Sequence, residues 1–253
     1  MKVYFVGAGP GDVELLTVRA DRLLRAAKCC VYAGSLVSPA VLALLPASAE
    51  RHDSAAMNLD QIVAVFESAR DRSIDVIRLH TGEPAIYGAI AEQMDALDRL
   101  GIDYEVVPGI SSFQAAAAAV RAELTAPEIA QTVILTRTAG RTPMPPTEDL
   151  ARLAETRATL CVFLSAGAAD AIVAALAPHY GADCPAAVVY HASWPDQKVS
   201  LGTLADLAQR MRLAEISRTA IILVGWAIAR PRGAASKLYD KSFSHGYREG
   251  KQS

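Results

Sequence analysis

The stretch from Val76 to Gly88, VIRLHTGEPAIYG, constrains the fold most strongly, because an apolar strand runs into a short polar loop. Gly82 and Pro84 end the strand within a few residues. After the loop, apolar residues recur at helical spacing and predict a helix; they are Ile86, Ile90, Met94 and Leu97. Open α/β sheets bind ligands at loops that follow the carboxyl ends of parallel strands. The segment therefore predicts an α/β fold with a candidate binding loop, although a plain turn into a helix would give the same pattern.

The N-terminus repeats this order of elements around a glycine-rich loop. Val3 to Val6 predicts a strand, GAGPGD follows it from Gly7 to Asp12, and Thr17 can cap the next helix. A dinucleotide-binding loop would carry glycine where Asp12 stands, and no acidic residue near Tyr32 ends the second strand to hold a ribose. The sequence therefore disfavours an NAD(P)-dependent oxidoreductase. Glycines still allow the backbone of this loop to approach a ligand closely, because they have no Cβ.

Helices and strands alternate along the chain, which predicts two α/β halves. The pattern restarts in the segment between Pro108 and Pro127, so the expected domains are residues 1–112 and 113–253. Further strands are expected at 104–107, 131–136, 159–164, 186–190 and 219–225, and further helices after Asn58 and at 115–119, 148–155, 168–177 and 203–211.

Composition and charge exclude several classes of function. Hydrophobic residues make up 52% and charged residues 21% of the 253 residues, which is a globular composition. A formal charge of -2 gives no general attraction to nucleic acid or to an anionic membrane, so an anionic ligand needs a local group of cations. The uncharged stretch 29–49 could span a bilayer by length, but Gly34, Pro39 and Pro46 interrupt it. A strand, a loop and a short helix are expected there instead.

The cysteines and histidines lack the spacing of metal ligands. No CxxC or HExxH occurs, so no metal is expected. Cys29 and Cys30, in a predicted strand, are expected to be small buried side chains in a reducing compartment. The N-terminal apolar run is too short for a signal peptide. A mature cytoplasmic protein is therefore expected.

A loop after the first strand of the second half carries two arginines. Arg137 and Arg141 stand in RTAGRTPMP, where glycine and prolines favour an open loop. Guanidinium groups can bind carboxylates or phosphates through paired hydrogen bonds. Surface arginines are more often only solvated, so this pair indicates an anion site only if another feature points to an anionic ligand.

Five motifs, in this order, give the chain a family resemblance. They are VGAGPGD, RLHTGEPAIYG, VVPGISSF, ILTRTAGRTP and the segment YHAS at 190–193. In this combination the chain resembles the tetrapyrrole methylases, two-domain enzymes that use S-adenosylmethionine, over almost its whole length. Three segments, VYAGSLV at 31–37, RTAGRTP and LYDKSFSHGYR, resemble most the members that methylate C-11 of precorrin-4 in cobalamin biosynthesis.

The resemblance implies that S-adenosylmethionine lies in a cleft between the two α/β domains. The residues that it assigns to the cofactor are Pro10, Thr81, Gly82, Glu83, Ile86, Ser111, Ser112, Leu164, Ser165 and Ala192. Glu83 stands where the family usually has aspartate, so a carboxylate is kept on a side chain one methylene longer. The family also implies a homodimer. Neither a nucleic-acid nor a membrane partner is expected.

The implied reaction gives the arginine loop a role. Methyl transfer from a sulfonium to a ring carbon needs donor and acceptor held in line, and it requires no metal. The acceptor would be a tetrapyrrole with many carboxylates, which Arg137 and Arg141 would bind. The uroporphyrinogen methylases carry a proposed basic aspartate in a Y-D-R-L-V segment, and the matching residue here is Ala33. No catalytic acid or base is therefore assigned.

Several alternatives stay open at this point. The sequence does not separate metal-free from cobalt-containing precorrin-4, and the missing aspartate counts against uroporphyrinogen III as the substrate. An NAD(P)-dependent oxidoreductase would bind NADH. A non-catalytic corrinoid carrier would bind a tetrapyrrole without S-adenosylmethionine, so binding of S-adenosylhomocysteine would argue against it.

Overall fold

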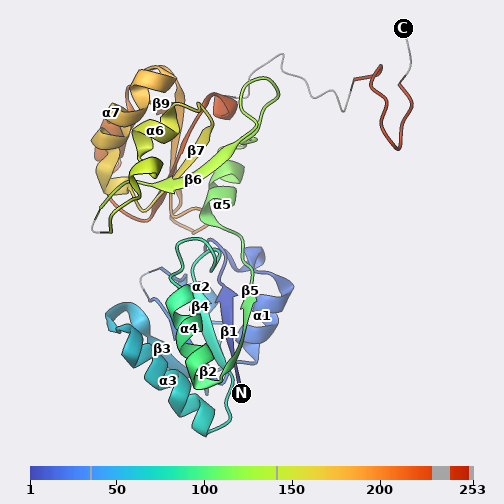
Figure 1. Cartoon of the computed structure of the whole chain (residues 1–253), viewed down its shortest axis with the longest axis vertical. Coiled ribbons are helices and arrows are strands. Elements are labelled where there is room, and N and C mark those ends of the chain that lie inside the picture. The colour runs from blue at the N-terminus through green and yellow to red at the C-terminus, as the bar shows by residue number, and fades with distance from the viewer. Residues whose placement is uncertain (35, 141, 230–239, 251–253) are drawn as a thin grey trace. The chain divides into compact units, whose positions relative to one another are not determined.

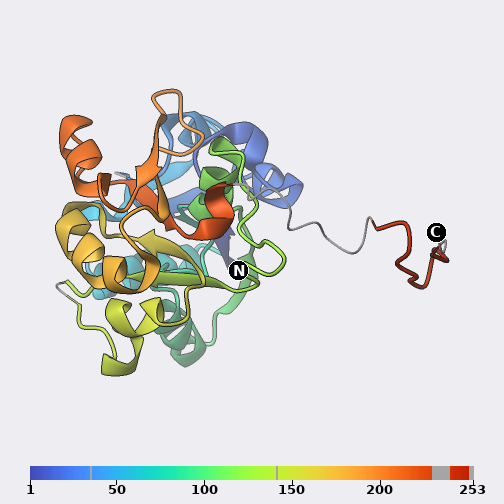
Figure 2. The same ribbon diagram turned by 90° about the horizontal axis from the view of Figure 1, so that it is seen from above.

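The computed structural model of the chain describes residues 1–34, 36–140, 142–229 and 240–250 (Figures 1 and 2). Its contacts divide the chain into two compact units. The first comprises Met1–Ala115 together with His191–Gln197, and the second comprises Ala116–Tyr190 and Lys198–Ser253. The sequence places the division between residues 112 and 113 and contains no signal for the return of 191–197 to the first unit.

The first unit contains a five-stranded parallel sheet in the order β3-β2-β4-β1-β5. Its strands are β1 (Lys2–Gly7), β2 (Cys29–Tyr32), β3 (Glu50–Asp53), β4 (Val76–His80) and β5 (Asp103–Val107). Its helices are α1 (Val18–Arg25), α2 (Pro39–Leu42), α3 (Leu59–Asp71) and α4 (Ala91–Leu100), and α5 (Ser112–Ala119) begins in it. Separate apolar clusters cover the two faces, one with α1 and α2 and the other with α3 and α4. This is the usual architecture of a buried parallel sheet.

Local sequence explains where most of these helices begin. Thr17 accepts a hydrogen bond from the Ala20 backbone and caps α1, as predicted. Asn58 and Gln61 form a capping box at the start of α3. The uncharged stretch 29–49 forms β2, a loop and α2, which confirms that expectation.

One prediction for the first unit is wrong, and one element of it was not predicted. The helix expected from Ile86 begins only at Ala91, because residues 84–90 form a loop in which Tyr87 and Ala89 have positive φ angles of 55° and 49°. Strand β3 has no predicted counterpart. Its sequence, ERHD, shows no apolar alternation because the strand lies at the edge of the sheet with partly exposed side chains.

The second unit contains a mixed sheet in the order β6-β7-β10-β8-β9, in which only β6 and β7 are parallel. The strands are β6 (Val133–Arg137), β7 (Thr159–Phe163), β8 (Pro185–Tyr190), β9 (Lys198–Thr203) and β10 (Ala220–Val224). The helices are α6 (Leu150–Ala154), α7 (Ala169–Tyr180) and α8 (Leu207–Leu213). Short 3-10 helices lie at Val13–Leu15, Ser54–Ala56, Pro146–Glu148, Ala166–Ala168 and Trp226–Ala229.

The region around β9 also differs from the prediction. After the predicted strand at 186–190, residues 191–196 form turns, in which His191 and Ser193 have positive φ angles of 45° and 68°. Strand β9 follows these turns and ends at Thr203, where the sequence predicts the start of a helix at 203–211. Helix α8 therefore starts at Leu207.

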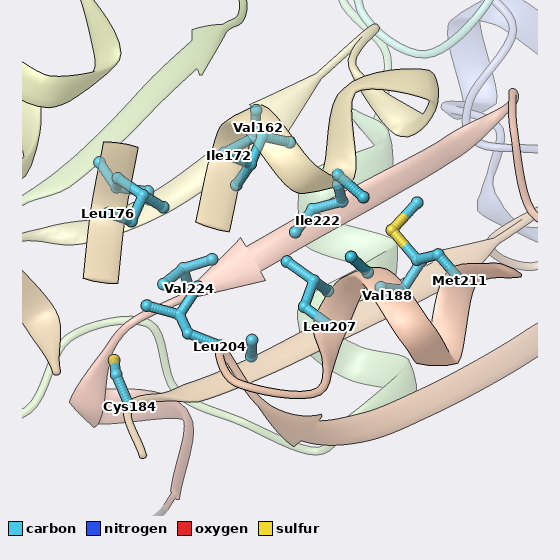
Figure 3. Packing of buried hydrophobic residues seen from close by; sticks show 14 of the residues in the cluster. Val162, Ile172, Leu176, Cys184, Val188, Leu204, Leu207, Met211, Ile222 and Val224 are labelled. Atoms are coloured by element: carbon cyan, nitrogen blue, oxygen red, sulfur yellow. The ribbon is translucent and has the colours of Figure 1, made fainter. Parts of the chain in front are cut away.

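The core of the second unit forms where α7 and α8 pack on the sheet (Figure 3). Ile172 and Leu176 of α7 and Leu207 of α8 are fully buried against side chains of β7, β8 and β10. Burial of each such side chain stabilises the fold by about 1.5–3 kcal/mol. The cysteines of the chain are free and buried, as expected for Cys29 and Cys30. Within the described part of the chain, no helix has both the length and the apolar content to span a bilayer.

Candidate functional site

Loops that follow three neighbouring strands of the first sheet meet at its carboxyl edge. The loop after β1 and the loop after β4 are joined by backbone hydrogen bonds. Gly82 N donates to Gly9 O at 2.8 Å, and Ala8 N donates to His80 O at 2.7 Å. Because β1 lies between β4 and β5, the loop after β5 reaches the same place.

Glycine is required where these loops cross. A Cβ on Gly7 would lie 2.6 Å from Gly109 Cα and 2.7 Å from Gly82 O, and a Cβ on Gly109 would overlap Gly82 O. The obstructing atoms are backbone atoms, which cannot turn aside as a flexible side chain can. Gly7 of the GAGPGD motif and Gly109 of the VVPG motif therefore allow the close contact among the loops.

Glu83 connects two of the three loops through its carboxylate. Oε2 accepts a hydrogen bond from Gly109 N at 2.8 Å, and Oε1 accepts one from Ala85 N at 2.9 Å. A carboxylate suits this position because it only accepts, and both donors are backbone N–H groups. The longer side chain at the usual aspartate position thus has defined partners.

Other predicted cofactor residues lie on the same loops. Gly82 is close to Ser111, since a Cβ on Gly82 would lie 3.6 Å from Ser111 Cα. Ser111 is buried, and its backbone N donates to Gln114 Oε1 at 2.9 Å beside Ser112, the first residue of α5. Thr81 Oγ1 donates to Leu36 O at 2.8 Å, which adds the loop after β2 to the group.

The segment 191–197 packs on the glycine-rich loop and belongs to the first unit. Trp194 Nε1 donates to Pro10 O at 2.8 Å, and Ser193 Oγ accepts a hydrogen bond from Asp12 N at 3.1 Å. The Trp194 ring stacks on His191 with ring centroids 4.6 Å apart. Ala192 is buried in this segment.

The structure therefore brings together, within the first unit, Pro10, Thr81, Gly82, Glu83, Ile86, Ser111, Ser112 and Ala192. Sequence reasoning missed Trp194, which joins the segment 191–197 to Pro10. The only available signal was a large aromatic residue in an otherwise polar turn.

A buried histidine lies directly before the loop of β4. His80 is 7% exposed, and its Nε2 has no hydrogen-bond partner. Burial, with the nearby Arg78 cation, lowers the pKa of His80 to about 3. The imidazole is therefore neutral at physiological pH.

The predicted cofactor residues of the second unit follow β7. Ser165 is 2% exposed, and its Oγ accepts hydrogen bonds from Thr138 N and Thr138 Oγ1 at 2.7 and 2.9 Å. It donates to Phe163 O at 2.6 Å. Leu164 is 74% exposed and has a positive φ of 51°. Ser165 thus connects the end of β7 to the arginine loop, while Leu164 presents an apolar side chain to solvent within this unit.

Arg137 is bound by its own loop. Nη1 donates to Thr138 O and Thr142 O at 3.2 and 3.0 Å, and Nη2 donates to Pro143 O at 2.9 Å. In this conformation the guanidinium closes the loop, a role that the sequence did not indicate. Arg141, and also Ser35, Leu238 and Tyr239 of the quoted motifs, lie outside the described residues.

One group of possible metal ligands occurs among the described residues, at the edge of the first sheet. Cys29, Glu50 and His52 each place one ligand atom within 4.8 Å of the others. Arg72 already binds Glu50 through both nitrogens, with Nη2 at 3.0 Å from Oε2. Burial and Glu50 raise the pKa of the Cys29 thiol to about 11. A cation would have to displace the arginine and remove this proton, so we assign no metal site here.

The joined loops on a parallel sheet, followed by a second α/β unit, define a class of two-unit α/β proteins. Comparison with known proteins gives the family. Residues 2–208 match the model of the Tetrapyrrole (Corrin/Porphyrin) Methylases. The chain is 48% identical over 250 residues to the precorrin-4 C(11)-methyltransferase of Pseudomonas aeruginosa, with 99% of this chain and 100% of the relative covered. The chain belongs to the tetrapyrrole methylase family, which confirms the resemblance and the fold class predicted from its motifs.

Solved structures agree with this assignment. The X-ray structure of a cobalamin biosynthetic enzyme, cobalt precorrin-4 methyltransferase, has a TM-score of 0.88 and 45% identity, with 90% of this chain and 95% of that chain covered. The uroporphyrin-III C-methyltransferase of Thermus thermophilus, complexed with S-adenosylhomocysteine, has a TM-score of 0.75 and 28% identity, with 91% and 99% of the two chains covered.

Proposed function

We propose that this protein is an S-adenosylmethionine-dependent methyltransferase that methylates C-11 of precorrin-4 to give precorrin-5 in cobalamin biosynthesis. The observation that carries the proposal is 48% identity over almost the entire length of both chains to a relative with this named activity. The complex of the Thermus thermophilus relative with S-adenosylhomocysteine supports the choice of methyl donor.

The cofactor is proposed to bind at the joined loops of the first unit. Glycine at the crossing points leaves no side chain between these loops, and Thr81 and Ala85 are exposed beside them, so a ligand at this edge can approach backbone groups closely. Leu164 and Ser165 of the second unit stay predicted contacts. Methyl transfer from a sulfonium releases a neutral thioether, so binding and alignment can supply much of the rate, and the proposal requires no metal. It assigns no acid or base.

The carrier and oxidoreductase alternatives are tested by calorimetry. The purified protein should bind S-adenosylhomocysteine and should not bind NADH. Absence of S-adenosylhomocysteine binding would favour the corrinoid carrier, and tight NADH binding would favour the oxidoreductase.

The position of methylation needs a direct test. Incubation with precorrin-4 and S-adenosylmethionine labelled in its methyl group, followed by NMR, should place the label at C-11. A parallel incubation with cobalt-precorrin-4 would identify the preferred acceptor, because the cobalt precorrin-4 methyltransferase is 45% identical to this chain. Label at another ring carbon would contradict the proposal, and so would methylation of uroporphyrinogen III when it replaces precorrin-4 in the incubation.

We further propose that Arg137 and Arg141 bind carboxylates of the tetrapyrrole. Arg137 can do so by exchanging some of its loop carbonyl partners for a substrate carboxylate. Arg141→Ala and Arg137→Met should each weaken tetrapyrrole binding about tenfold and leave S-adenosylhomocysteine affinity unchanged. Arg212→Met removes an exposed arginine that is paired with Asp170, so it serves as the control. Equal losses for both ligands would contradict this role.

A cytoplasmic homodimer completes the proposal. Free, buried cysteines suit a reducing compartment, and burial raises the pKa of Cys30, Cys161 and Cys184 to about 12, which keeps these thiols protonated. Light scattering tests the oligomeric state, and a monomeric mass would contradict the dimer.

A further inference from the structure

A buried arginine lies beneath the loop that follows β4. Arg78, in the middle of this strand, is 7% exposed. Its Nε donates to Gln93 Oε1 at 2.8 Å, and its Nη1 lies 3.2 Å from Ser54 Oγ. No carboxylate among the described residues forms an ion pair with it. Burying a cation with only neutral acceptors costs free energy, so we ask what its hydrogen bonds do for the fold.

The arginine fixes the orientation of one buried amide. Gln93 is 4% exposed and is the third residue of α4. Because an arginine only donates, Gln93 must turn its oxygen toward Arg78 and its NH₂ group the other way. There, Gln93 Nε2 donates to Ala89 O at 2.9 Å. The hydrogen bonds therefore run from Arg78 through Gln93 to the loop before α4.

The loop that receives this bond is strained. Tyr87 and Ala89 have positive φ angles without being glycine, and a Cβ on Gly88 would overlap Pro84 O. Each such backbone conformation costs about 1 kcal/mol or more and persists only where the surroundings hold it. Glu83 holds the start of the loop through Ala85 N, and Gln93 holds its end.

The other contacts of Arg78 reach the end of β2. Ser54 Oγ, beside Arg78 Nη1, donates to Tyr32 O at 3.0 Å, and Arg78 Nη1 also lies 3.4 Å from Val31 O. Tyr32 is the last residue of β2, and the loop that follows contains Leu36, the acceptor of Thr81. A single buried cation thus connects the end of β2 with the loop between β4 and α4.

We infer that Arg78 and Gln93 are positioning residues that hold residues 84–90, and with them Ile86, in the shape that receives S-adenosylmethionine. This rests on the proposed function, because the identity of the ligand comes from there. Neither side chain needs to touch the cofactor.

The variant Gln93→Glu distinguishes an effect on the loop from an effect on overall stability. The carboxylate still accepts from Arg78 and adds an ion pair, but it has no N–H for Ala89 O. The affinity for S-adenosylhomocysteine, measured by calorimetry, should fall about tenfold, while the urea midpoint is unchanged or higher. Amide hydrogen exchange in residues 85–89 should become faster in the unliganded variant.

Gln61→Glu is the matched control. Gln61 is also the third residue of a helix in the first unit, and its Oε1 accepts a hydrogen bond from Asn58 N. The same charge change there should leave S-adenosylhomocysteine affinity and exchange at 85–89 unchanged. Arg78→Lys gives a second test, because lysine keeps the charge but replaces the guanidinium fork with a single ammonium. Its affinity should fall about threefold.

The outcomes are distinguishable. If the unchanged protein fails to bind S-adenosylhomocysteine, the proposed function fails. If it binds but Gln93→Glu binds equally well, the positioning role is overturned and the proposed function stands. Affinity and urea midpoint falling together in Gln93→Glu, without a local change at 85–89, would also overturn the positioning role.

Discussion

The candidate site residues of the two units are held by different kinds of contact. In the first unit, hydrogen bonds join loops far apart in sequence, such as Trp194 to Pro10 over 184 positions and Gly109 to Glu83 over 26. In the second unit, Arg137 binds carbonyls one, five and six positions away, and Ser165, which binds Thr138 over 27 positions, is the only described candidate residue with a longer reach. Long-range contacts fix several loops at once, whereas local ones leave a loop able to exchange partners. This difference suits the roles proposed for them, a rigid cofactor site in the first unit and an adaptable substrate loop in the second.

The largest effect should come from adding one carbon where the loops of the first unit cross. In Gly109→Ala the new Cβ overlaps Gly82 O and lies 2.8 Å from Gly7 Cα. We expect a loss of about 3 kcal/mol in the free energy of unfolding in urea. Gly140→Ala, in the arginine loop, meets nothing within 4 Å and should change stability by less than about 0.5 kcal/mol. Similar losses at both positions would remove the distinction between the units.

Acid should lower the free energy of unfolding because His80 is buried in its neutral form. Its pKa is about 3 in the folded protein, below the ordinary value of 6.5. The unfolded chain therefore binds a proton that the folded chain excludes, and stability falls as the pH drops from 6.5 toward 3. Roughly 2 kcal/mol should be lost between pH 7 and pH 5. Urea unfolding at both pH values measures this loss, and His80→Leu should reduce it. An unchanged pH dependence in that variant would assign the loss to other groups.

Glu83 tests whether the connection between loops matters for the ligand. In Glu83→Gln one backbone donor, Ala85 N or Gly109 N, must face an NH₂ group. We expect a loss of about 1.5 kcal/mol in stability and a roughly tenfold weaker S-adenosylhomocysteine affinity by calorimetry. Glu83→Asp keeps the charge and shortens the reach, so its loss should be smaller. A larger loss in Glu83→Asp would mean that length, and not charge, decides the contact.

The sequence predicted elements whose cause is local, and it missed those whose cause is distant. Asn58 marked the start of α3 because its cap lies three residues away. The start of α4 was wrong because Gln93 and Glu83 hold a strained loop where apolar spacing indicated a helix. Strand β3, at one sheet edge, shows no apolar alternation, and β9, at the edge of the other sheet, leaves its two apolar side chains, Val199 and Leu201, exposed.

The same difference between local and distant causes decides which residues of the candidate site the sequence could predict. Motifs placed Pro10, Glu83 and Ser111 in loops that the fold joins, since glycines and strand ends are visible in the sequence. The roles of Trp194 and Arg78 depend on partners that only the fold brings near. Arg137 was expected to face an anion, but its own loop supplies three carbonyl acceptors that no spacing rule identifies.

The smallest effect should come from Trp194, where one hydrogen bond can be removed and most of the ring kept. Trp194→Phe leaves Pro10 O without its donor, which should cost about 1 kcal/mol in stability and weaken S-adenosylhomocysteine binding about threefold. The other tryptophan, Trp226, lies in the second unit, so in Trp226→Phe all tryptophan fluorescence comes from the segment 191–197. S-adenosylhomocysteine should change that fluorescence in Trp226→Phe and leave the signal of Trp194→Phe almost constant. A response confined to Trp226 would mean that the ligand does not affect the segment 191–197, and the proposed binding of the cofactor at the fixed loops of the first unit would be contradicted.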